Sequence, residues 1–348
     1  LIAITPSIRM IPSFNFIDGF PDDVESKAGY ELLKKGFAPG DLSPTTVFIH
    51  TPDNDVIDQS DFIELLAQEI ENSPGVNHVK GMTRPYGSYI GDQLDAVSLK
   101  MFNSPDGTTS RLDVSLEGDP YSEKALTVID DLRSIIKSTI RSQSMTGVEV
   151  LVGGDTAVQF DTKTVIDEDT KLLAPLILFA ILGVLIVIQR SLVAPLYLLF
   201  SVIISYAATF GISIFIFQDL LNHTGVAYSN GIWIFVFLVA LGADYNIFVI
   251  ARIKEETERL GFNEGIAVAV GKTGGVVTSA GIILASTFAV LTTLPLRDVF
   301  QLGMAVMLGV LIDTFVVRTL LVPSMAAILK SYSWWPSLGP GKSSATLH

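Results

Sequence analysis

The fold is decided by the stretch Val239-Ala-Leu-Gly-Ala-Asp-Tyr-Asn-Ile-Phe-Val-Ile-Ala-Arg-Ile-Lys-Glu-Glu256, where one carboxylate, Asp244, interrupts an apolar helical pattern. A charged side chain near the middle of a membrane-spanning helix costs about 2.5 to 3.5 kcal/mol on insertion scales. Counted back from Arg252 along a helix, Asp244 lies about 12 Å inside the membrane boundary, beyond the reach of a short side chain. A residue at that depth is normally neutralised, paired or functional. The stretch therefore predicts a membrane helix that carries a functional acid.

The composition divides the chain into an acidic part and an apolar part. Of its 348 residues 49% are hydrophobic, and the mean hydropathy is +0.48. Residues 1–170 hold 28 Asp and Glu against 13 Lys and Arg, whereas residues 171–348 hold 8 against 10. We therefore predict an external domain over 1–170, a transmembrane domain over 171–330 and a cytoplasmic tail over 331–348. The acidic domain argues against nucleic acid as a partner, and the absence of cysteine excludes disulfides and thiolate sites.

Five segments are apolar enough to cross a bilayer, which takes about 20 residues each. They cover approximately residues 172–189, 192–217, 231–251, 274–294 and 300–329. Basic residues fall in alternate connections, which predicts a cytoplasmic C-terminus and places residues 1–170 outside. The charged stretch 254–270 suits an amphipathic helix on the cytoplasmic membrane surface. Leu1-Ile-Ala-Ile4 looks like the end of a preceding helix, so we expect the chain to be part of a longer polypeptide.

The external domain shows two βαβ-like patterns in tandem, which predict an α+β ferredoxin-like (split βαβ) module. The expected strands cover residues 46–50, 75–80, 110–117 and 148–152, and the expected helices cover 57–71 and 122–141. Residues 83–109 would be an insertion, and 156–169 a helix leading into the first span. Asp53-Asn54-Asp55 lacks the spacing of a calcium loop and is better explained by helix capping. The four scattered histidines lack the spacing of metal ligands, so we expect no metal site.

Further polar residues lie in the spans near the expected depth of Asp244. Tyr245 follows it directly, and the hydroxyls of Thr278 and Ser279 lie at a similar depth in the fourth span. Asp313 and Arg318 lie in the last span, where a structural pair or a snorkelling Arg is as good an interpretation as a functional role. For Asp244 we weigh a helix-gluing role against a titrating proton site and favour the proton site. Its candidate supports are Thr278, Ser279, Asp313 and Arg318.

Two patterns in the fourth span concern packing and nucleotide binding. Gly271, Gly275 and Ser279 form a small-residue stripe of the kind that lets two helices approach closely. Ala269-Val-Gly-Lys-Thr273 contains the end of a P-loop, but Ile266 stands where its first Gly belongs and no strand precedes it. We therefore expect neither a nucleotide nor another cofactor.

Gly242-Ala-Asp-Tyr245 in the third span, followed by the charged helix end Arg252-Ile-Lys-Glu-Glu256, resembles the C-terminal half of an MmpL-type transporter of the resistance-nodulation-division (RND) superfamily. Trp334-Trp-Pro336 also resembles the chain ends of that family. The resemblance implies two pseudo-repeated halves, each contributing an Asp-Tyr pair to a central proton relay; here only Asp244 and Tyr245 match. It implies export of lipids or hydrophobic compounds across the cytoplasmic membrane, driven by protons, with a missing N-terminal half and the surrounding membrane lipids as partners.

Two alternatives to transport are open at this point. An intramembrane aspartyl protease would use Asp244 and Asp313 as a dyad, but Leu241-Gly-Ala-Asp244 lacks the second Gly of the Gly-x-Gly-Asp element of those proteases. We therefore expect a protein that is not an enzyme. The other alternative is a SecDF-like or sterol-sensing-like RND relative that acts as a translocation helper or sensor. The cargo and the oligomeric state cannot be derived from the sequence.

Overall fold

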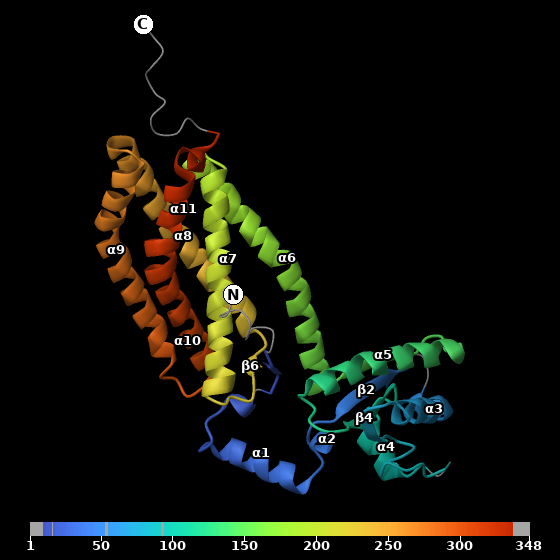
Figure 1. The fold of residues 1–348 in the computed structure, drawn as a ribbon. Coiled ribbons are helices and arrows are strands. Elements are labelled where there is room, and N and C mark those ends of the chain that lie inside the picture. Colours follow the sequence, from blue (N-terminus) through green and yellow to red (C-terminus); the bar gives the residue numbers. More distant parts are fainter. Residues whose placement is uncertain (1–9, 16, 53–54, 92–93, 337–348) are drawn as a thin grey trace. The chain divides into compact units, whose positions relative to one another are not determined.

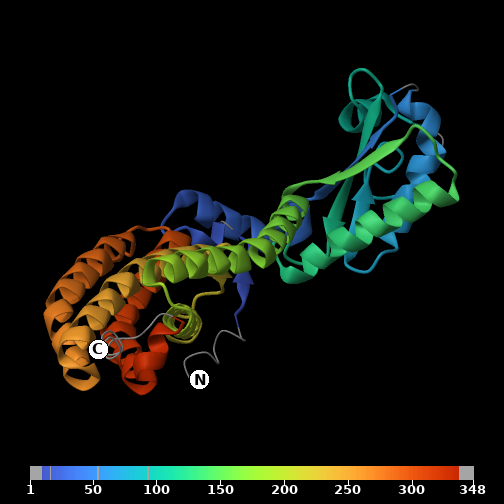
Figure 2. The same cartoon turned by 90° about the horizontal axis from the view of Figure 1, so that it is seen from above.

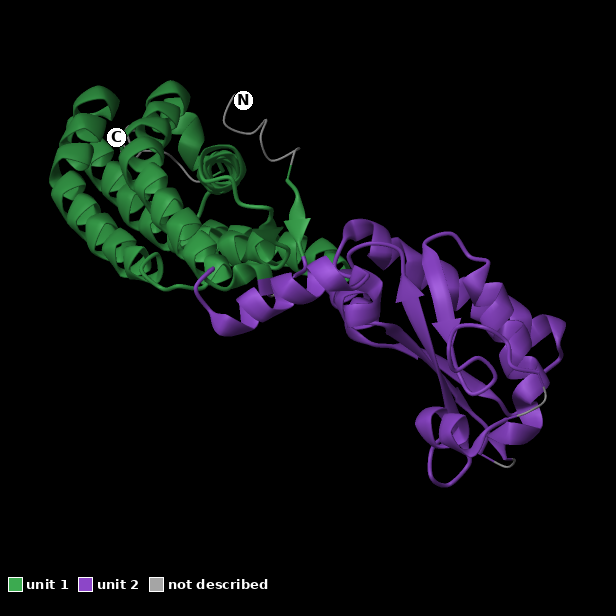
Figure 3. Ribbon diagram, turned by 90° about the horizontal axis from the view of Figure 1, so that it is seen from below, with its two compact units in different colours: residues 1–13, 18–21, 167–348 green, residues 14–17, 22–166 purple. Residues whose placement is uncertain are grey.

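The computed structural model describes residues 10–15, 17–52, 55–91 and 94–336. The chain forms two compact units (Figure 3): unit 1 comprises residues 1–13, 18–21 and 167–348, and unit 2 comprises residues 14–17 and 22–166. The predicted boundary at residue 170 lies close to the observed one. The start of the chain differs from the prediction, because β1 (Pro12–Ser13) pairs in parallel with β6 (Val226–Ala227) of the helical unit. The segment Leu1–Ile4 and His348 lie outside the described residues.

Unit 2 is built on a four-stranded sheet. Its strands are β2 (Thr45–His50), β3 (Val76–Lys80), β4 (Thr109–Leu116) and β5 (Glu149–Gly153), in the order β3-β4-β2-β5. Every neighbouring pair is antiparallel. Helix α3 (Ser60–Glu71) connects β2 to β3, and α5 (Glu123–Ser142) connects β4 to β5. The predicted strands and helices of this part are thus present within a few residues of their expected ends.

Buried and exposed side chains alternate along the strands, so one face of this sheet packs against helices. Val47 and Ile49 of β2 are fully buried, whereas Phe48 between them is exposed. Since successive side chains of a strand point to opposite faces, one face carries the core of the unit together with α3 and α5. Asp55 accepts a hydrogen bond from the backbone N–H of Ile57 at 3.0 Å, so the capping interpretation is confirmed for this residue. Asp53 and Asn54 lie outside the described residues.

Smaller helices complete unit 2. Helix α4 (Ala96–Phe102) lies within the predicted insertion, while α1 (Glu25–Gly36) and α2 (Pro39–Leu42) precede the sheet. A short 3-10 turn, η3 (Val56–Gln59), leads into α3. Gly40 of α2 is required by the close approach to β4, since a Cβ there would lie 2.7 Å from the backbone nitrogen of Leu116.

Unit 1 is a helical bundle (Figures 1 and 2). Its elements are α6 (Asp155–Gln189, of which residues 167–189 belong to this unit), α7 (Val193–Ile214), η4 (Phe215–Leu220), α8 (Asn230–Leu260), α9 (Phe262–Leu291), α10 (Arg297–Ile312), η5 (Asp313–Leu321), α11 (Val322–Leu329) and η6 (Lys330–Trp334). In the described part of the chain, five helical stretches are long and apolar enough to span a membrane, as predicted. They are Asp155–Gln189, Val193–Leu220, Asn230–Leu260, Phe262–Leu291 and Arg297–Trp334. The helix expected before the first span is continuous with that span in α6.

The expected separate surface helix over residues 254–270 is wrong. Helix α8 continues to Leu260, Gly261 turns the chain with φ +79°, and α9 begins at Phe262. The turn is tight, because a Cβ on Gly265 would lie 2.6 Å from the carbonyl oxygen of Glu256. Buried Glu256 also pairs with Lys272 of α9 at 2.7 Å. These contacts hold the charged stretch inside a helical hairpin.

The first residues of the predicted tail over 331–348 are packed against the bundle. Residues 330–334 form η6, and the side chain of Trp334 is buried against the bundle. The ammonium group of Lys254 lies 5.3 Å from the centre of its ring. The backbone N–H of Leu192 donates to the carbonyl of Trp335 at 2.8 Å. A cation over an indole ring and a buried aromatic both favour a packed chain over a solvated tail.

Candidate functional site

The predicted Asp-Tyr pair lies in the middle of α8. Gly242, one turn before Tyr245, is buried against α7, and a Cβ there would lie 3.2 Å from Cγ2 of Val202. Asp244 is exposed on the surface of the described chain, and Tyr245 is half-buried. Asp244 has no hydrogen bond or ion pair with any residue that the structure describes. The acid is therefore held at the edge of this unit, with its oxygens unoccupied by the residues around it.

Tyr245 joins α8 to the last span. The guanidinium carbon of Arg318 lies 4.1 Å from the centre of the Tyr245 ring, which is a cation–π contact. The same guanidinium donates a long hydrogen bond, 3.4 Å, to the carbonyl of Leu241, one turn earlier in α8. The sequence analysis named Arg318 as a candidate support for Asp244. In the structure Arg318 instead packs against the ring of the neighbouring Tyr245 and forms an ion pair with Asp313.

Asp313 and Arg318 form a buried ion pair in η5. Their residues are 6% and 4% exposed, so both charges are shielded from the surroundings. The carboxylate also packs against α8, since a Cβ on Gly242 would lie 3.9 Å from its Oδ1. The sequence left open a structural pair or a snorkelling Arg, and the structure contains the pair. Its Arg318 contacts the ring of Tyr245.

A π-helix makes this pair possible. Residues five positions apart are about 140° apart around an α-helix, so Asp313 and Arg318 would not share a face. Segment η5 is a π-helix, whose hydrogen bonds join residues five apart and bring them into line. Pro323 in the next turn supplies a cause, because it has no N–H to donate to the carbonyl of Thr319 and its ring crowds that carbonyl. Short π segments inside α-helices occur frequently at functional sites.

Two further residues of this site were missed by the sequence analysis. Asn246 and Thr314 are 1% and 0% exposed, and their side-chain oxygens have no hydrogen-bond partner among the described residues. The same holds for Oδ1 of Asp313 and for Nε and Nη1 of Arg318. Buried polar groups normally have a hydrogen-bond partner, so these atoms have unused hydrogen-bonding capacity within the described chain. The signal available in the sequence was the polar Asn246, which directly follows the Asp-Tyr pair in an otherwise apolar span.

The expected support from α9 is not where it was predicted. The hydroxyl of Ser279 donates to the carbonyl of Val276 in its own helix at 3.0 Å, and Thr278 shows no hydrogen bond to Asp244 within the described chain. Among the described residues the small-residue stripe contacts no other helix, because a Cβ on Gly271 or Gly275 would meet nothing within 4 Å. The contact with the site is made by Gly281 instead.

Gly281 of α9 packs directly against Thr314 of η5. A Cβ on Gly281 would lie 2.7 Å from Cγ2 of Thr314 and would overlap its hydroxyl. The site thus has three walls, from α8, η5 and α9, and each close approach depends on a glycine or a small side chain.

The P-loop lookalike is part of a regular helix. Lys272 donates to buried Glu256 at 2.7 Å, and the hydroxyl of Thr273 donates to the carbonyl of Ala269 at 2.8 Å, one turn earlier. Glu256 also accepts ion pairs from Arg252 at 2.7 Å and from Arg259 at 2.9 Å. The lysine is therefore engaged in the hairpin between α8 and α9, and the backbone N–H groups of this segment are used by the helix.

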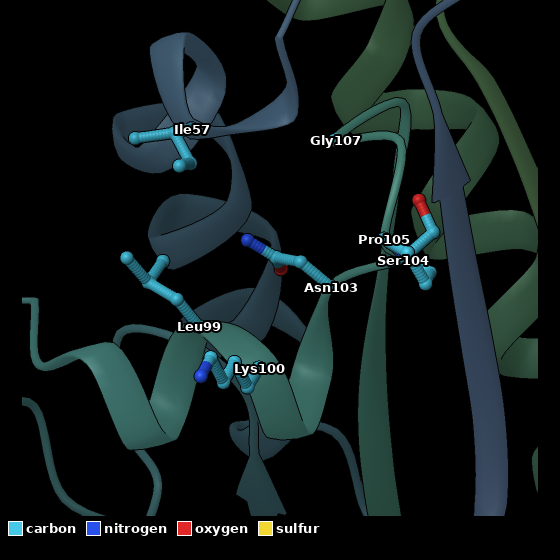
Figure 4. Close-up of a pocket in the computed structure, with 7 residues that line it drawn as sticks. All are labelled: Ile57, Leu99, Lys100, Asn103, Ser104, Pro105 and Gly107. Atoms are coloured by element: carbon cyan, nitrogen blue, oxygen red, sulfur yellow. The ribbon is translucent and has the colours of Figure 1, made fainter.

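Unit 2 contains a separate open pocket of about 450 Å³ beside α4. Its lining is mostly apolar with one cationic side chain, and comprises Ile57, Leu99, Lys100, Asn103, Ser104, Pro105 and Gly107. Figure 4 shows the amide of Asn103 pointing toward the side of the pocket where Ile57 and Leu99 lie. That amide is already used, because its oxygen accepts from the hydroxyl of Ser110 at 2.7 Å. None of the predicted site residues lines this pocket.

The family of the chain follows from comparison with known proteins. The sequence model of the MMPL family matches residues 18–344. This chain belongs to the MMPL family. The resemblance inferred from Gly242-Ala-Asp-Tyr245 is thereby confirmed at the level of the family.

Three relatives illustrate the range of the family. A putative membrane protein of Streptomyces coelicolor is 38% identical over 325 residues, covering 93% of this chain and 36% of the relative. The apo-petrobactin exporter of Bacillus anthracis is 31% identical over 338 residues, covering 97% and 42%. The sulfolipid-1 exporter MmpL8 of Mycobacterium tuberculosis is 37% identical over 263 residues, covering 74% and 24%. The chain thus spans less than half the length of these MMPL relatives. Membership and the five apolar helices make it a multi-pass membrane protein.

Proposed function

We propose that the chain is the second half of a proton-driven exporter of lipids or hydrophobic compounds. The observation that carries the proposal is the stacking of Tyr245 on Arg318, which joins the residue next to exposed Asp244 to the buried Asp313–Arg318 pair. The names of two relatives support the cargo class, one as an exporter of a sulfolipid and the other of apo-petrobactin. The relatives are more than twice as long as the part that this chain matches, which supports a complementary half that takes part in transport.

In the proposed mechanism, Asp244 is the group that accepts and releases the driving proton. It is the acid of the site whose oxygens are free of ion pairs within the described chain, whereas Asp313 is paired with Arg318. Protonation of Asp244 removes a negative charge beside Tyr245, and the field of that charge acts on the cation stacked on the ring. The strengths of the contacts that Arg318 makes with Tyr245, Leu241 and Asp313 then change. As a result, η5 moves relative to α8. Thr278 and Ser279 play no direct part in this version of the relay.

The two units have separate tasks in the proposal. Unit 2 is the external porter domain, and its ferredoxin-like assignment is supported by the sheet order β3-β4-β2-β5 with α3 and α5 as the two crossovers. Orientation rests on the positive-inside rule, with Arg252, Arg259 and Lys272 at the cytoplasmic turn between α8 and α9. Unit 1 spans the cytoplasmic membrane and drives unit 2.

The protease alternative is less well supported than transport. A catalytic dyad needs two carboxyl groups that share one water and one proton. Asp313 is instead buried and paired with Arg318, while Asp244 is exposed. We therefore propose a transporter without enzymatic activity of its own.

The proposal is tested by efflux of the hydrophobic dye Nile red from cells that express the full-length protein, with and without a protonophore. We expect efflux that the protonophore abolishes, and we expect Asp244→Asn to remove that component completely. Asp219→Asn is the matched control, because Asp219 is an exposed Asp of the same bundle at the end of η4, and it should leave efflux unchanged. Protonophore-sensitive efflux that survives Asp244→Asn contradicts the assigned role of the acid.

A further inference from the structure

Gln301 is a fully buried amide at the end of the bundle where α10 begins. Its oxygen accepts a hydrogen bond from the backbone N–H of Ala227 at 3.1 Å, and its nitrogen donates to the carbonyl of Gly225 at 2.9 Å. An N–H can only donate and a carbonyl can only accept, so these two partners fix which end of the amide is which. The remaining hydrogen of the Gln301 amide nitrogen points at Nδ1 of His223, 3.1 Å away.

This geometry determines the protonation state of His223. Because the amide nitrogen of Gln301 is a donor, Nδ1 of the imidazole must be the acceptor, which requires the neutral ring with its hydrogen on Nε2. The charged ring carries a hydrogen on both nitrogens. Protonation of His223 therefore places the Nδ1–H of the ring against the N–H of the Gln301 amide. Two donors cannot form a hydrogen bond, so the contact is lost.

The surroundings of the ring also favour the neutral form. Phe217 of η4 stacks on it at 6.1 Å between ring centres, and Phe300 of α10 meets it edge-on at 6.0 Å. The pKa of His223 is lowered from its ordinary value, first by burial and then by the nearby positive charge of Arg297 in α10. Asp219 of η4 and Asp298 of α10 are the other titratable residues of these two elements, and in the described chain neither bonds to the ring.

The segment that His223 begins also holds β1. The backbone N–H of Val226 donates to the carbonyl of Ile11 at 3.0 Å, and that of Tyr228 donates to the carbonyl of Ser13 at 3.3 Å. Arg297 clamps the same pair of segments, donating to Thr224 at 2.8 Å and to Ser13 at 3.2 Å. A neutral His223 thus contributes to a small cap, formed by β1 and residues 223–228, over the start of α10.

We propose that the contact between His223 and Gln301 is a proton-sensitive latch, which keeps the β1–β6 cap closed while His223 is neutral and releases it when His223 is protonated. The inference goes beyond proton-driven export and stands independently of it, since the latch lies at the end of the bundle and uses none of the residues of the relay. It places a proton-responsive contact at one end of the bundle.

The sign of the pH dependence follows from the lowered pKa. In an unfolded or open segment His223 takes up a proton near its ordinary value of about 6.5, whereas in the closed cap it resists protonation. The closed form is therefore fully favoured above about pH 6.5 and loses stability as the pH falls from there toward the lowered pKa of the closed state. Below that lowered value no further loss is expected.

Hydrogen–deuterium exchange of the full chain in lipid nanodiscs tests the latch. We expect the amides of Val226, Ala227 and Tyr228, after correction for intrinsic exchange rates, to lose up to about tenfold in protection between about pH 7.5 and about pH 5, the size expected when one buried hydrogen bond is lost. His223→Asn removes the titration but keeps an acceptor oxygen at the position of Nδ1, so its protection should not change with pH. A parent protein with pH-independent protection, or a His223→Asn variant with the same loss as the parent, overturns the proposal.

A second variant separates the latch from a general loss of folding. Gln301→Glu supplies a carboxylate that accepts from a protonated ring, so the imidazole should hold its proton to higher pH than in the parent protein. Nitrogen-15 NMR of histidine-labelled protein in bilayers reads this directly, with the signal of His223 assigned by its absence in His223→Asn. We expect a neutral ring protonated on Nε2 in the parent at about pH 7. A ring that is already charged at that pH, or that Gln301→Glu leaves unchanged, contradicts the latch.

Discussion

The guanidinium of Arg318 lies 4.1 Å from the centre of the Tyr245 ring and at the same time pairs with Asp313. One cation thus connects the residue beside Asp244 with a buried carboxylate of another span. Because low-dielectric surroundings strengthen such interactions, a change of charge at Asp244 has a short path to η5. The observed contact uses the ring face of Tyr245, so substitutions that keep or remove the ring test it.

Tyr245→Phe and Tyr245→Leu should differ in stability. The Phe variant keeps an aromatic face for Arg318, whereas the Leu variant loses the cation–π contact and about 0.5 to 2 kcal/mol of unfolding free energy. Unfolding in mixed detergent micelles measures this difference. If the hydroxyl takes part in the relay, Tyr245→Phe loses protonophore-sensitive Nile red efflux at nearly unchanged stability. Equal stability of the two variants would show that the ring face contributes nothing.

The buried ion pair should show strong coupling between its two members. Arg318→Met alone leaves the Asp313 carboxylate buried without a partner, which typically costs about 3 to 5 kcal/mol. The double variant Asp313→Leu with Arg318→Met removes both charges, so most of that loss should be recovered. A double-mutant cycle in mixed micelles measures the coupling, which we expect to be about 2 kcal/mol or more. Additive losses would mean that the two charges do not interact in solution.

The elements of the fold that local patterns determine were predictable from the sequence. In β2 the alternation of Val47, Phe48 and Ile49 is a property of neighbouring residues, and the spans follow from uninterrupted apolar length. The pairing of β1 with β6 was not predictable, because it joins residues more than 200 positions apart and involves two residues in each strand. The hairpin at Gly261 was missed because the alternation of charged and apolar residues over 254–270 indicated a surface helix, whereas buried Glu256 of α8 pairs with Lys272 of α9.

Asp244 and Tyr245 stay predicted site residues, and the contacts around them differ from those that the sequence suggested. Depth along a helix suggested Thr278 and Ser279, but depth does not say which way a side chain points, and Ser279 bonds within its own helix. The pairing of Asp313 with Arg318 depends on a π-helix, which sequence periodicity based on regular α-helices cannot indicate. Structure was therefore needed to identify Gly281 and Thr314 as the contact from α9.

Asp113 of β4 should make unit 2 less stable at neutral pH than at acid pH. Burial raises the pKa of its carboxyl, while Arg111 and Lys80 act in the opposite direction. A raised pKa in the folded state means that folding favours the protonated acid, so this contribution is present below the ordinary pKa and is lost as the pH rises through the raised value. Asp113→Asn should therefore increase the protection of β4 amides at about pH 7, by a fraction of 1 kcal/mol. At about pH 3.5 the two proteins should not differ, and a gain that persists there contradicts burial of the charged carboxylate as the cause.

Gly281→Ala should disrupt the wall between α9 and η5. The new methyl would lie 2.7 Å from Cγ2 of Thr314, so the two helices must shift apart and we expect a loss of about 1 to 3 kcal/mol. Mixed-micelle unfolding measures the loss, and protonophore-sensitive Nile red efflux should fall with it if η5 carries the proposed motion. Thr314→Ala removes the atoms that collide, so adding it to Gly281→Ala should restore much of the stability.

Gly275→Ala is the matched control for this substitution, because it lies in the same helix and its new methyl would meet nothing within 4 Å. Ala is a better helix former than Gly by about 1 kcal/mol, so this variant should be as stable as the parent or slightly more stable. A loss at Gly275 equal to that at Gly281 would point to a general intolerance of α9 rather than to the contact with Thr314. Failure of Thr314→Ala to rescue Gly281→Ala would contradict the packing of these two residues directly.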